Sequence, residues 1–238
     1  MTLIDNKAEL KKYARLYSIE SSKTTPKDLA FRDLPKLLNK YHVGNNALDF
    51  GCGVGESTLF LKSQGLKTCG VDINAEMVEI AKKNDPSGKY VHISHAKIPC
   101  KDNTYDLVFA SFVLVEMSSL EQIQEVLNEI SRVLKNKGFF IAILCSKNLY
   151  KYKWKKINTD FPQNKNLKRG QKVRVEFLDK GFSIEDYYWP QEDYIRVMNN
   201  AGLDLLEIHK PLGLESDGID WEDEIFVSPI SVYITSKR

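Results

Sequence analysis

One glycine-rich segment constrains the fold of this 238-residue chain more than any other feature. Residues 49–58 read DFGCGVGEST and lie between an apolar run that predicts a strand and a segment that predicts a helix. Glycine lets the backbone turn tightly and approach a ligand where a Cβ atom would intrude. A strand, a glycine-rich turn and a helix in this order predict a cofactor-binding loop in an α/β fold.

The register and the charge of this loop indicate the kind of cofactor. A dinucleotide-binding pattern that began at Gly51 would have glycine or alanine at position 56, where this chain has Glu56. Two carboxylates, Asp49 and Glu56, flank the loop and would repel a pyrophosphate. They are compatible with a ligand that carries a sulfonium and an ammonium group.

A further carboxylate follows at the end of the second predicted strand. Asp72 stands at roughly the 20-residue spacing from Gly51 at which an acidic residue accepts hydrogen bonds from both hydroxyls of a ribose. Dinucleotide enzymes share this feature, so Asp72 indicates an adenosine ligand without naming it. The loop and Asp72 are therefore interpreted together.

Apolar runs alternate with helical patterns from residue 46 onward, which is typical of βα units around a parallel sheet. The spacing of Ser118 and Glu121 predicts a capping box for the helix before the fifth strand, and Asn74 is expected to cap an earlier helix. A further helix is predicted over 190–201. The predicted strands are 47–50, 67–71, 90–93, 106–110, 139–144, 205–208 and 230–234.

Two helices are predicted before this alternation begins. Tyr13 and Tyr17 share an apolar face of the first helix. Pro26 suits the first turn of the second helix, because a proline there removes no helical hydrogen bond. Pro35 is expected to interrupt or kink that second helix.

Composition excludes several classes of protein. Hydrophobic residues make up 42% of the chain and charged residues 28%, which is ordinary for a globular protein, and the length suits one α/β domain. The apolar run 139–145 is far shorter than the ~20 residues of a membrane-spanning helix, and the charged N-terminal segment is unlike a secretory signal, so no membrane partner and a cytoplasmic location are expected. No metal or redox site is expected, because no CxxC pair or nearby histidine accompanies Cys52, Cys69, Cys100 and Cys145.

The motifs, taken in order, resemble the class I family of S-adenosylmethionine-dependent methyltransferases. LDFGCGVGEST is followed by GVDINAEMVEIAKK, IPCKDNTYDLVFASFVL and LKNKGFFIAI, and the resemblance is good over roughly residues 45–145. It implies a doubly wound α/β fold with helices on both faces of a mostly parallel seven-stranded sheet, whose last strand is antiparallel. It also implies an enzyme that transfers the methyl group of S-adenosylmethionine.

The chain is expected to form one domain with four parts. An N-terminal helical cover spans 1–45, and the cofactor-binding core spans 46–145. An acceptor-side insertion between strands five and six spans 146–203, and the C-terminal strands span 204–238.

The resemblance also implies a cofactor site. Gly51 and Gly53 would bracket the methionine end, Asp72 would hold the ribose, and Ile73 and Met77 would face the adenine. Where the family often has an acid for the adenine amino group, this chain has a serine and a histidine, so a hydroxyl or backbone oxygen is expected in that role. The full set is Asp49, Gly51, Cys52, Gly53, Gly55, Asp72, Ile73, Met77, Ser94, His95, Ala96, Ser111, Phe112 and Val113.

Methyl transfer from a sulfonium is an in-line displacement, so the protein mainly aligns the nucleophile and excludes water. A general base is optional, and Glu116 and His95 are the candidates because both follow predicted strands. A small organic acceptor with an oxygen or nitrogen nucleophile is the favoured hypothesis. The aromatic residues that could wall its pocket, each also explicable by simple packing, are Tyr13, Tyr17, Trp154, Tyr187, Tyr188 and Trp189.

Two other functions stay open from the sequence. Residues 147–174 hold ten basic residues and one acidic residue and include YKYKWKK, so an RNA methyltransferase is the first alternative. A solvated loop would have the same composition, the net charge of the chain is only +2, and the acidic stretch 215–224 is expected to complement the basic one. The second alternative is a non-catalytic, cofactor-binding regulatory subunit. The sequence does not indicate an oligomeric state.

Overall fold

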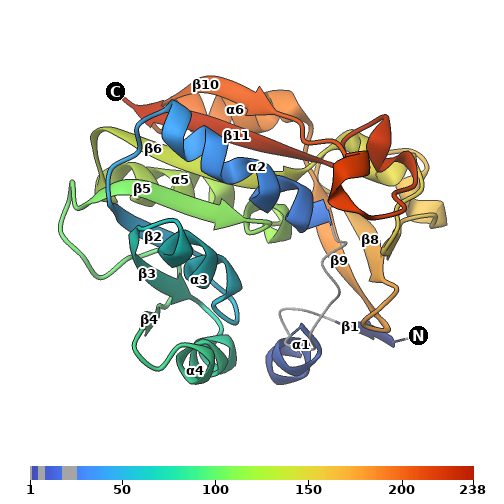
Figure 1. Cartoon of the computed structure of the whole chain (residues 1–238), viewed down its shortest axis with the longest axis horizontal. Coiled ribbons are helices and arrows are strands. Elements are labelled where there is room, and N and C mark those ends of the chain that lie inside the picture. Colours follow the sequence, from blue (N-terminus) through green and yellow to red (C-terminus); the bar gives the residue numbers. More distant parts are fainter. Residues whose placement is uncertain (1, 5–8, 18–25) are drawn as a thin grey trace.

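The computed structural model describes residues 2–4, 9–17 and 26–238, and a seven-stranded sheet forms its centre (Figure 1). The strands lie in the order β10-β11-β6-β5-β2-β3-β4, and all pairs are parallel except those of β11 with its two neighbours. The predicted doubly wound sheet with an antiparallel last strand is therefore confirmed. The strands are β2 (Asn46–Phe50), β3 (Lys67–Asp72), β4 (Lys89–His92), β5 (Tyr105–Ser111), β6 (Leu134–Cys145), β10 (Leu203–His209) and β11 (Ile230–Lys237).

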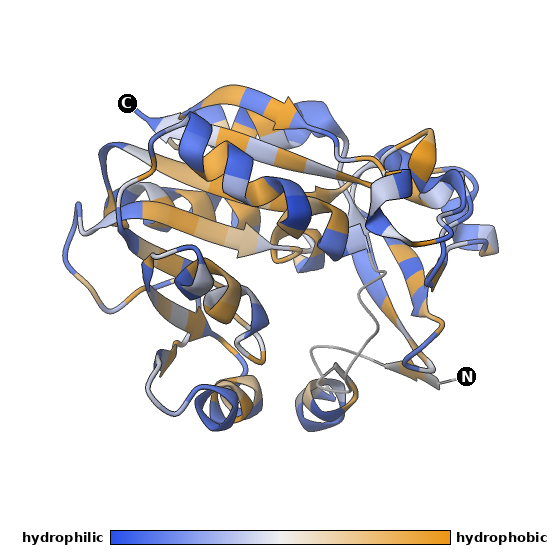
Figure 2. Ribbon diagram, in the orientation of Figure 1, coloured by the Kyte–Doolittle hydropathy of each residue, from blue (hydrophilic) through white to orange (hydrophobic). Residues whose placement is uncertain are grey.

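Helices cover both faces of this sheet. Successive side chains of β5 belong to opposite faces, with Leu107 and Phe109 in one apolar cluster and Val108 and Ala110 in the other. The first cluster is covered by α2 (Pro26–Lys40) and α3 (Glu56–Ser63), and the second by α5 (Leu120–Val133) and α6 (Gln191–Asn200). Figure 2 shows the strands of the large sheet mostly in hydrophobic colours, as two buried faces require.

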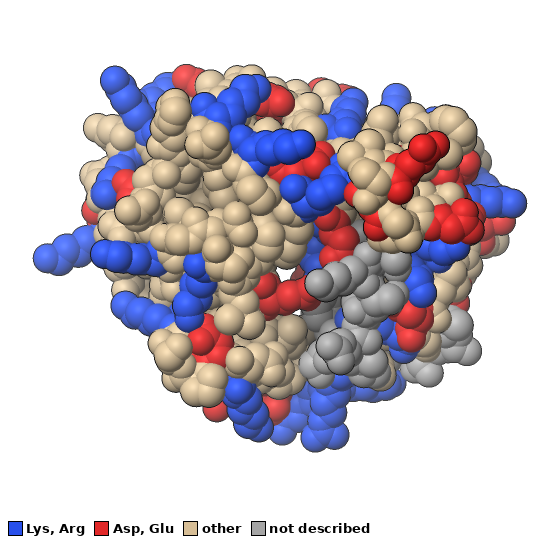
Figure 3. Space-filling model, viewed as in Figure 1, with Lys and Arg blue, Asp and Glu red and all other residues tan. Residues whose placement is uncertain are grey.

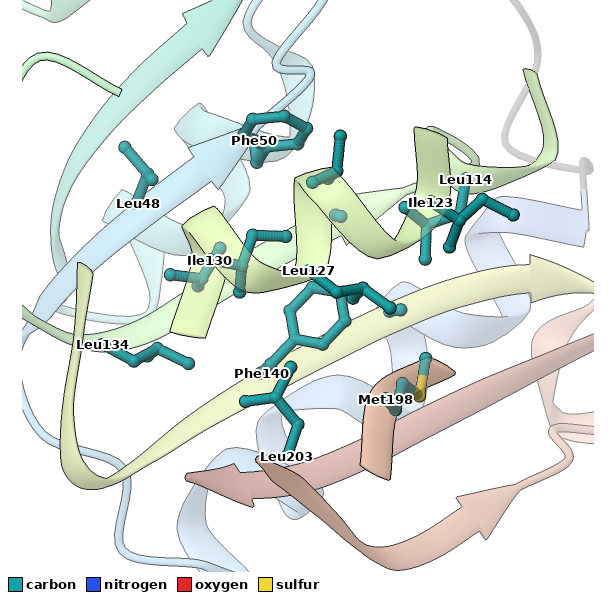
Figure 4. Close-up of a cluster of buried hydrophobic side chains, with 14 of the residues drawn as sticks. Leu48, Phe50, Leu114, Ile123, Leu127, Ile130, Leu134, Phe140, Met198 and Leu203 are labelled. Carbon is teal, nitrogen blue, oxygen red and sulfur yellow. The ribbon is translucent and has the colours of Figure 1, made fainter. Parts of the chain in front are cut away.

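The helix α5 supplies the largest share of the core on its face of the sheet (Figure 4). Its N-cap is Ser119, whose hydroxyl accepts a hydrogen bond from the N–H of Gln122 at 3.2 Å. The predicted cap at Ser118 is therefore wrong by one residue, because Ser119 and not Ser118 has the extended cap backbone and this hydrogen bond. The buried side chains of α5 are Ile123, Val126, Leu127, Ile130 and Val133.

Two other helix predictions have different outcomes. Asn74 caps α4 (Ala75–Asn84) as predicted, since its side chain accepts from the N–H groups of Glu76 and Met77. The second helix begins at Pro26 as predicted but is not interrupted at Pro35. The buried apolar face of α2 packs on the sheet, and this packing offsets the hydrogen bond that proline cannot make.

A second, four-stranded sheet was not predicted. It contains β7 (Ile157–Asn158), β8 (Gln171–Phe177) and β9 (Phe182–Tyr188), and β1 (Thr2–Ile4) adds a parallel strand to β9. The short helix α1 (Leu10–Tyr17) follows β1. This small sheet stands beyond the carboxyl end of β5, where the 3-10 helix η1 (Leu114–Glu116) packs against β9.

Among the described helices, none combines the length and the apolar character needed to cross a membrane. The described residues contain no group of three acidic, histidine or cysteine side chains that could hold a metal ion. All four cysteines are free thiols.

Replacing Leu127 by alanine is expected to lower the free energy of unfolding by about 2–5 kcal/mol, because the fully buried side chain leaves a cavity behind. Urea denaturation followed by circular dichroism measures this loss. The matched control is Asn128→Ala at the next, exposed position, which should change stability by less than about 0.5 kcal/mol. Equal effects of the two substitutions would contradict the orientation of α5.

Candidate active site

A cavity of about 620 Å³ opens at the carboxyl edge of the large sheet. Its walls come from the loops after β2, β3, β4 and β5, from α1 and the start of α2, and from β8 and β9. Ligands of open parallel sheets bind at this edge, next to the point where the strand order reverses, which here lies between β2 and β5. Figure 3 shows a hollow near the centre of one face of the molecule, with acidic side chains at its border.

The glycine loop forms one wall of the cavity. Gly51 and Gly53 both have a positive φ, of 74° and 52°. A Cβ atom on Gly51 would lie 2.3 Å from a methyl group of Val113, whereas a Cβ atom on Gly53 would meet no atom within 4 Å. The first glycine is thus required by packing, and the second leaves the backbone open to a ligand.

Asp72 connects this loop to the end of β3. Its Oδ2 accepts a hydrogen bond from the N–H of Gly53 at 2.8 Å, and its Oδ1 accepts one from the N–H of Asn74 at 2.8 Å. Burial raises the pKa of Asp72, and these two hydrogen bonds oppose that shift. A carboxylate offers about four acceptor positions, so Asp72 keeps capacity for the hydroxyl groups of a ribose.

Asp49 lies fully buried behind the loop. Its Oδ2 accepts hydrogen bonds from the hydroxyls of Ser57 and Thr58, both at 2.6 Å, and its Oδ1 has no hydrogen-bond partner among the described residues. Burial raises the pKa of Asp49 to about 6, although the two hydroxyl hydrogen bonds act in the opposite direction. A buried acid with spare acceptor capacity therefore supports the floor of the site.

Most residues predicted for the cofactor line this single cavity. A buried hydroxyl is among them, since Oγ of Ser111 has no hydrogen-bond partner within the described part of the chain. Such a group costs free energy unless a ligand or water meets it, so this wall fits a polar ligand. Asp49, Gly55 and Ser94 do not line the cavity. Those that do are Gly51, Cys52, Gly53, Asp72, Ile73, Met77, His95, Ala96, Ser111, Phe112 and Val113.

Both candidate bases line the same cavity. Glu116 ends η1, directly after β5. His95 follows β4 and has a left-handed backbone, with a φ of 56°. The segments after β4 and β5 thus bring these two residues to the wall of one chamber.

The predicted aromatic wall is only partly assembled. Tyr13 lines the cavity, and the side chain of Tyr17 lies outside the described part of the structure. The indole N–H of Trp154 donates to a backbone carbonyl at 2.7 Å inside an apolar cluster, so this residue serves in packing. Not among the lining residues are Trp154, Tyr187, Tyr188 and Trp189.

The residues of the opposite wall were missed by the sequence analysis. The available signal was the alternation of apolar and polar residues in the segments that form β8 and β9. This alternation does not indicate which face of the strands lines a cavity. Lys27 and Lys180 were also missed. Burial and the charge of Lys27 lower the pKa of Lys180, and Glu56 raises it. The other missed residues that line the cavity include Leu149, Ile157, Val175, Phe177, Ile184 and Asp186.

Comparison with known proteins agrees with this geometry. Residues 48–142 match the family model of a methyltransferase domain. An uncharacterized methyltransferase of Synechocystis sp. is 32% identical over 113 residues, which are 48% of this chain and 53% of that protein. A demethylmenaquinone methyltransferase of Bacillus licheniformis is 29% identical over 76% of this chain and 75% of its own length, and a sterol 24-C-methyltransferase of Gibberella zeae is 31% identical over 74% of this chain and 43% of its own.

Among the curated relatives that match most strongly, the chain spans about half to three fifths of their length. The fold is also found in solved structures. A putative S-adenosylmethionine-dependent methyltransferase from Listeria monocytogenes superposes with a TM-score of 0.64 at 20% identity, covering 89% of this chain and 99% of that one. This likeness concerns the fold.

The substitution Asp49→Asn is expected to stabilise the protein by roughly 1–3 kcal/mol at pH 8, because it removes a buried negative charge. The folded-state pKa of about 6 lies above the ordinary value of 3.8, so the folded state retains a proton that the unfolded chain releases. The destabilising contribution of Asp49 therefore grows as the pH rises from about 4 to 6 and is complete above that range.

Urea denaturation of wild type and variant at pH 4 and pH 8 measures this difference. The stability gained by the substitution should be small at pH 4 and full at pH 8. Asp179→Asn, at an exposed position, serves as the control and should show no such pH-dependent gain. A gain of equal size at both pH values would show that the charge of Asp49 is not its cause.

Proposed function

We propose that the protein transfers a methyl group from S-adenosylmethionine to an oxygen or nitrogen atom of a small organic molecule, since residues 48–142 match the family model of a methyltransferase domain. One observation carries this proposal. A single cavity joins the residues of the cofactor motifs to an apolar wall from the small sheet. A donor and an apolar acceptor would therefore share one chamber.

The cofactor half of the cavity suits this donor. When bound there, S-adenosylmethionine would supply an electrophilic methyl group on its sulfonium. Asp72 would accept hydrogen bonds from the ribose hydroxyls, and Ile73 and Met77 would offer apolar surface to the adenine. The open backbone at Gly53 would let the methionine end approach closely.

The other half would orient the acceptor and exclude water. Its apolar side chains would surround the nucleophile, and the carbon–sulfur bond would break as the new bond to the methyl carbon forms. Glu116 or His95 would take up the proton that the acceptor loses. We assign the cover to residues 1–45 and acceptor recognition to the insertion 146–203, with Tyr13 contributing from the cover.

The charges of the insertion favour a small acceptor over RNA. Lys155, Arg169 and Lys172 form ion pairs with acidic side chains at 3.0–3.3 Å. On the face shown in Figure 3, lysines and arginines are scattered among uncharged residues and do not form a continuous basic surface. Ionic pairing of this kind competes with phosphate binding. The names of the sterol and demethylmenaquinone methyltransferases also support a small acceptor.

The isolated protein is expected to bind S-adenosylmethionine and its demethylated product S-adenosylhomocysteine, and not NAD, because Glu56 stands where a dinucleotide-binding loop has glycine or alanine and because Asp49 and Glu56 flank the loop. Isothermal titration calorimetry with the three compounds measures this preference. Turnover of methyl-labelled cofactor with cell extracts then tests catalysis, and nuclease treatment of the extracts separates RNA from small acceptors. Binding of NAD without binding of S-adenosylhomocysteine would refute the proposal, and binding without turnover would favour a regulatory subunit.

Asp72→Ala is expected to weaken the binding of S-adenosylhomocysteine by roughly 1–3 kcal/mol, because it removes the acceptor for the ribose hydroxyls and the anchor of Gly53. Calorimetry measures the affinity, and thermal unfolding verifies that the variant is folded. Glu79→Ala, at an exposed position of α4, is the control and should leave the affinity unchanged. An unchanged affinity in the Asp72 variant would place the ribose elsewhere.

A further inference from the structure

The indole of Trp189 links the insertion to the segment that follows β5. Trp189 comes directly after β9 and directly before Pro190, the N-cap of α6. Its Nε1–H donates a hydrogen bond to the backbone carbonyl of Met117 at 3.0 Å. Met117 is the C-cap of η1 and lines the cavity. A side chain outside the cavity wall is therefore bonded to the backbone of a residue in that wall.

The hydrogen bonds within η1 are weak. The N–H of Glu116 donates to the carbonyl of Val113 at 3.2 Å, and the N–H of Met117 donates to the carbonyl of Leu114 at 3.4 Å. These distances are long for hydrogen bonds between backbone groups, and the geometry of a 3-10 helix is poorer than that of an α-helix. The last carbonyls of a helix have no partner within it. Trp189 supplies such a partner at the end of η1.

The other end of η1 lies against the glycine loop. Its N-cap is Val113, and a Cβ atom on Gly51 would lie 2.3 Å from a methyl group of this valine. Leu114 and Val115 hold the middle of η1 in the core, since each is at most 2% exposed. Because closely packed groups transmit a displacement, a shift of η1 would move Val113 against the loop. The same short helix carries Glu116, the candidate base, at the cavity wall.

The ring of Trp189 is itself held in place. A Cβ atom on Gly170, in the turn before β8, would lie 3.1 Å from this ring. Gly170 has a φ of 71°, and its N–H donates to the carbonyl of Tyr188 at 2.9 Å. The ring also packs against the apolar cluster that α5 and α6 cover. A side chain that positions a functional group needs support of this kind.

We infer that Trp189 is a positioning residue for methyl transfer. Through the carbonyl of Met117 it fixes the end of η1, and η1 in turn holds Val113 against the glycine loop and Glu116 at the cavity wall. This assignment rests on the proposed function. It gives the insertion a second role besides acceptor recognition, because part of the insertion supports the wall that would receive the cofactor.

The test begins with Trp189→Phe, which keeps an aromatic ring and removes the N–H donor. The variant is expected to bind S-adenosylhomocysteine about 3- to 10-fold more weakly than wild type, because the carbonyl of Met117 loses its partner and η1 loses an anchor. Calorimetry on the full chain measures both affinities, and thermal unfolding verifies that the variant is folded.

The matched control is Trp221→Phe. The indole N–H of Trp221 donates to Asp217 at 2.9 Å, Trp221 is 8% exposed, and neither residue lines the cavity. This variant therefore loses the same kind of buried hydrogen bond at a site remote from η1. Its affinity for S-adenosylhomocysteine should equal that of wild type, even where its thermal stability falls as far as that of Trp189→Phe.

A spectroscopic measurement on the unsubstituted chain tests the same role. The chain has three tryptophans, so labelling with 5-fluorotryptophan gives three ¹⁹F resonances. Trp154→Phe and Trp221→Phe identify two of them, and the third belongs to Trp189. Addition of S-adenosylhomocysteine should shift the resonance of Trp189 and leave that of Trp221 in place. A tryptophan that served only in packing would not respond in this way.

The outcomes separate the two levels of the proposal. Failure of S-adenosylhomocysteine to bind wild type would refute the proposed function and the role of Trp189 with it. If it binds wild type, an equal affinity in Trp189→Phe overturns the role of Trp189 alone, and so does an equal loss of affinity in Trp221→Phe. If Trp189→Phe does not fold, the ¹⁹F measurement decides, and an unshifted Trp189 resonance overturns the assignment.

Discussion

The hydrogen bonds that Asp72 accepts from the N–H groups of Gly53 and Asn74 hold the site together. They join the glycine loop after β2 to the turn after β3, so one carboxylate links the loops of two neighbouring strands. The same carboxylate faces the cavity. One side chain therefore combines a structural role with the position from which a ribose would be bound.

The small sheet converts this edge of the fold into a chamber. The loops after the parallel strands form one side of the cavity, and β8 and β9 supply the opposite wall of apolar side chains. The pairing of Thr2–Ile4 with β9 ties the beginning of the chain to the middle of the insertion. Under the proposed function, acceptor specificity would vary in these segments while the edge formed by the glycine loop stays the same.

Three buried polar groups sit around the cavity at a cost to stability. Asp49 has a raised pKa, Ser111 has a hydroxyl without a hydrogen-bond partner among the described residues, and Asp186 occupies an apolar row of β9. A fold selected for stability alone would have apolar groups at these positions. Their gathering around one chamber is the physical signature of a binding site.

The large sheet, most helix starts and the gathering of the motif residues at one edge of the sheet could be predicted from the chain, because these features depend on short-range signals. The apolar run and the positions of the glycines predict β2 and the loop that follows it. The carboxyl ends of parallel strands must then meet at one edge of the sheet. Tertiary packing decided three features that short-range signals did not. These are the helix cap at Ser119 instead of Ser118, the continuity of α2 through Pro35 and the existence of the small sheet. Tertiary packing also decided that Trp154 lies in a core and that Asp186 lines the cavity. The alternation of residues along a strand shows which side chains share a face, but it does not show what that face contacts.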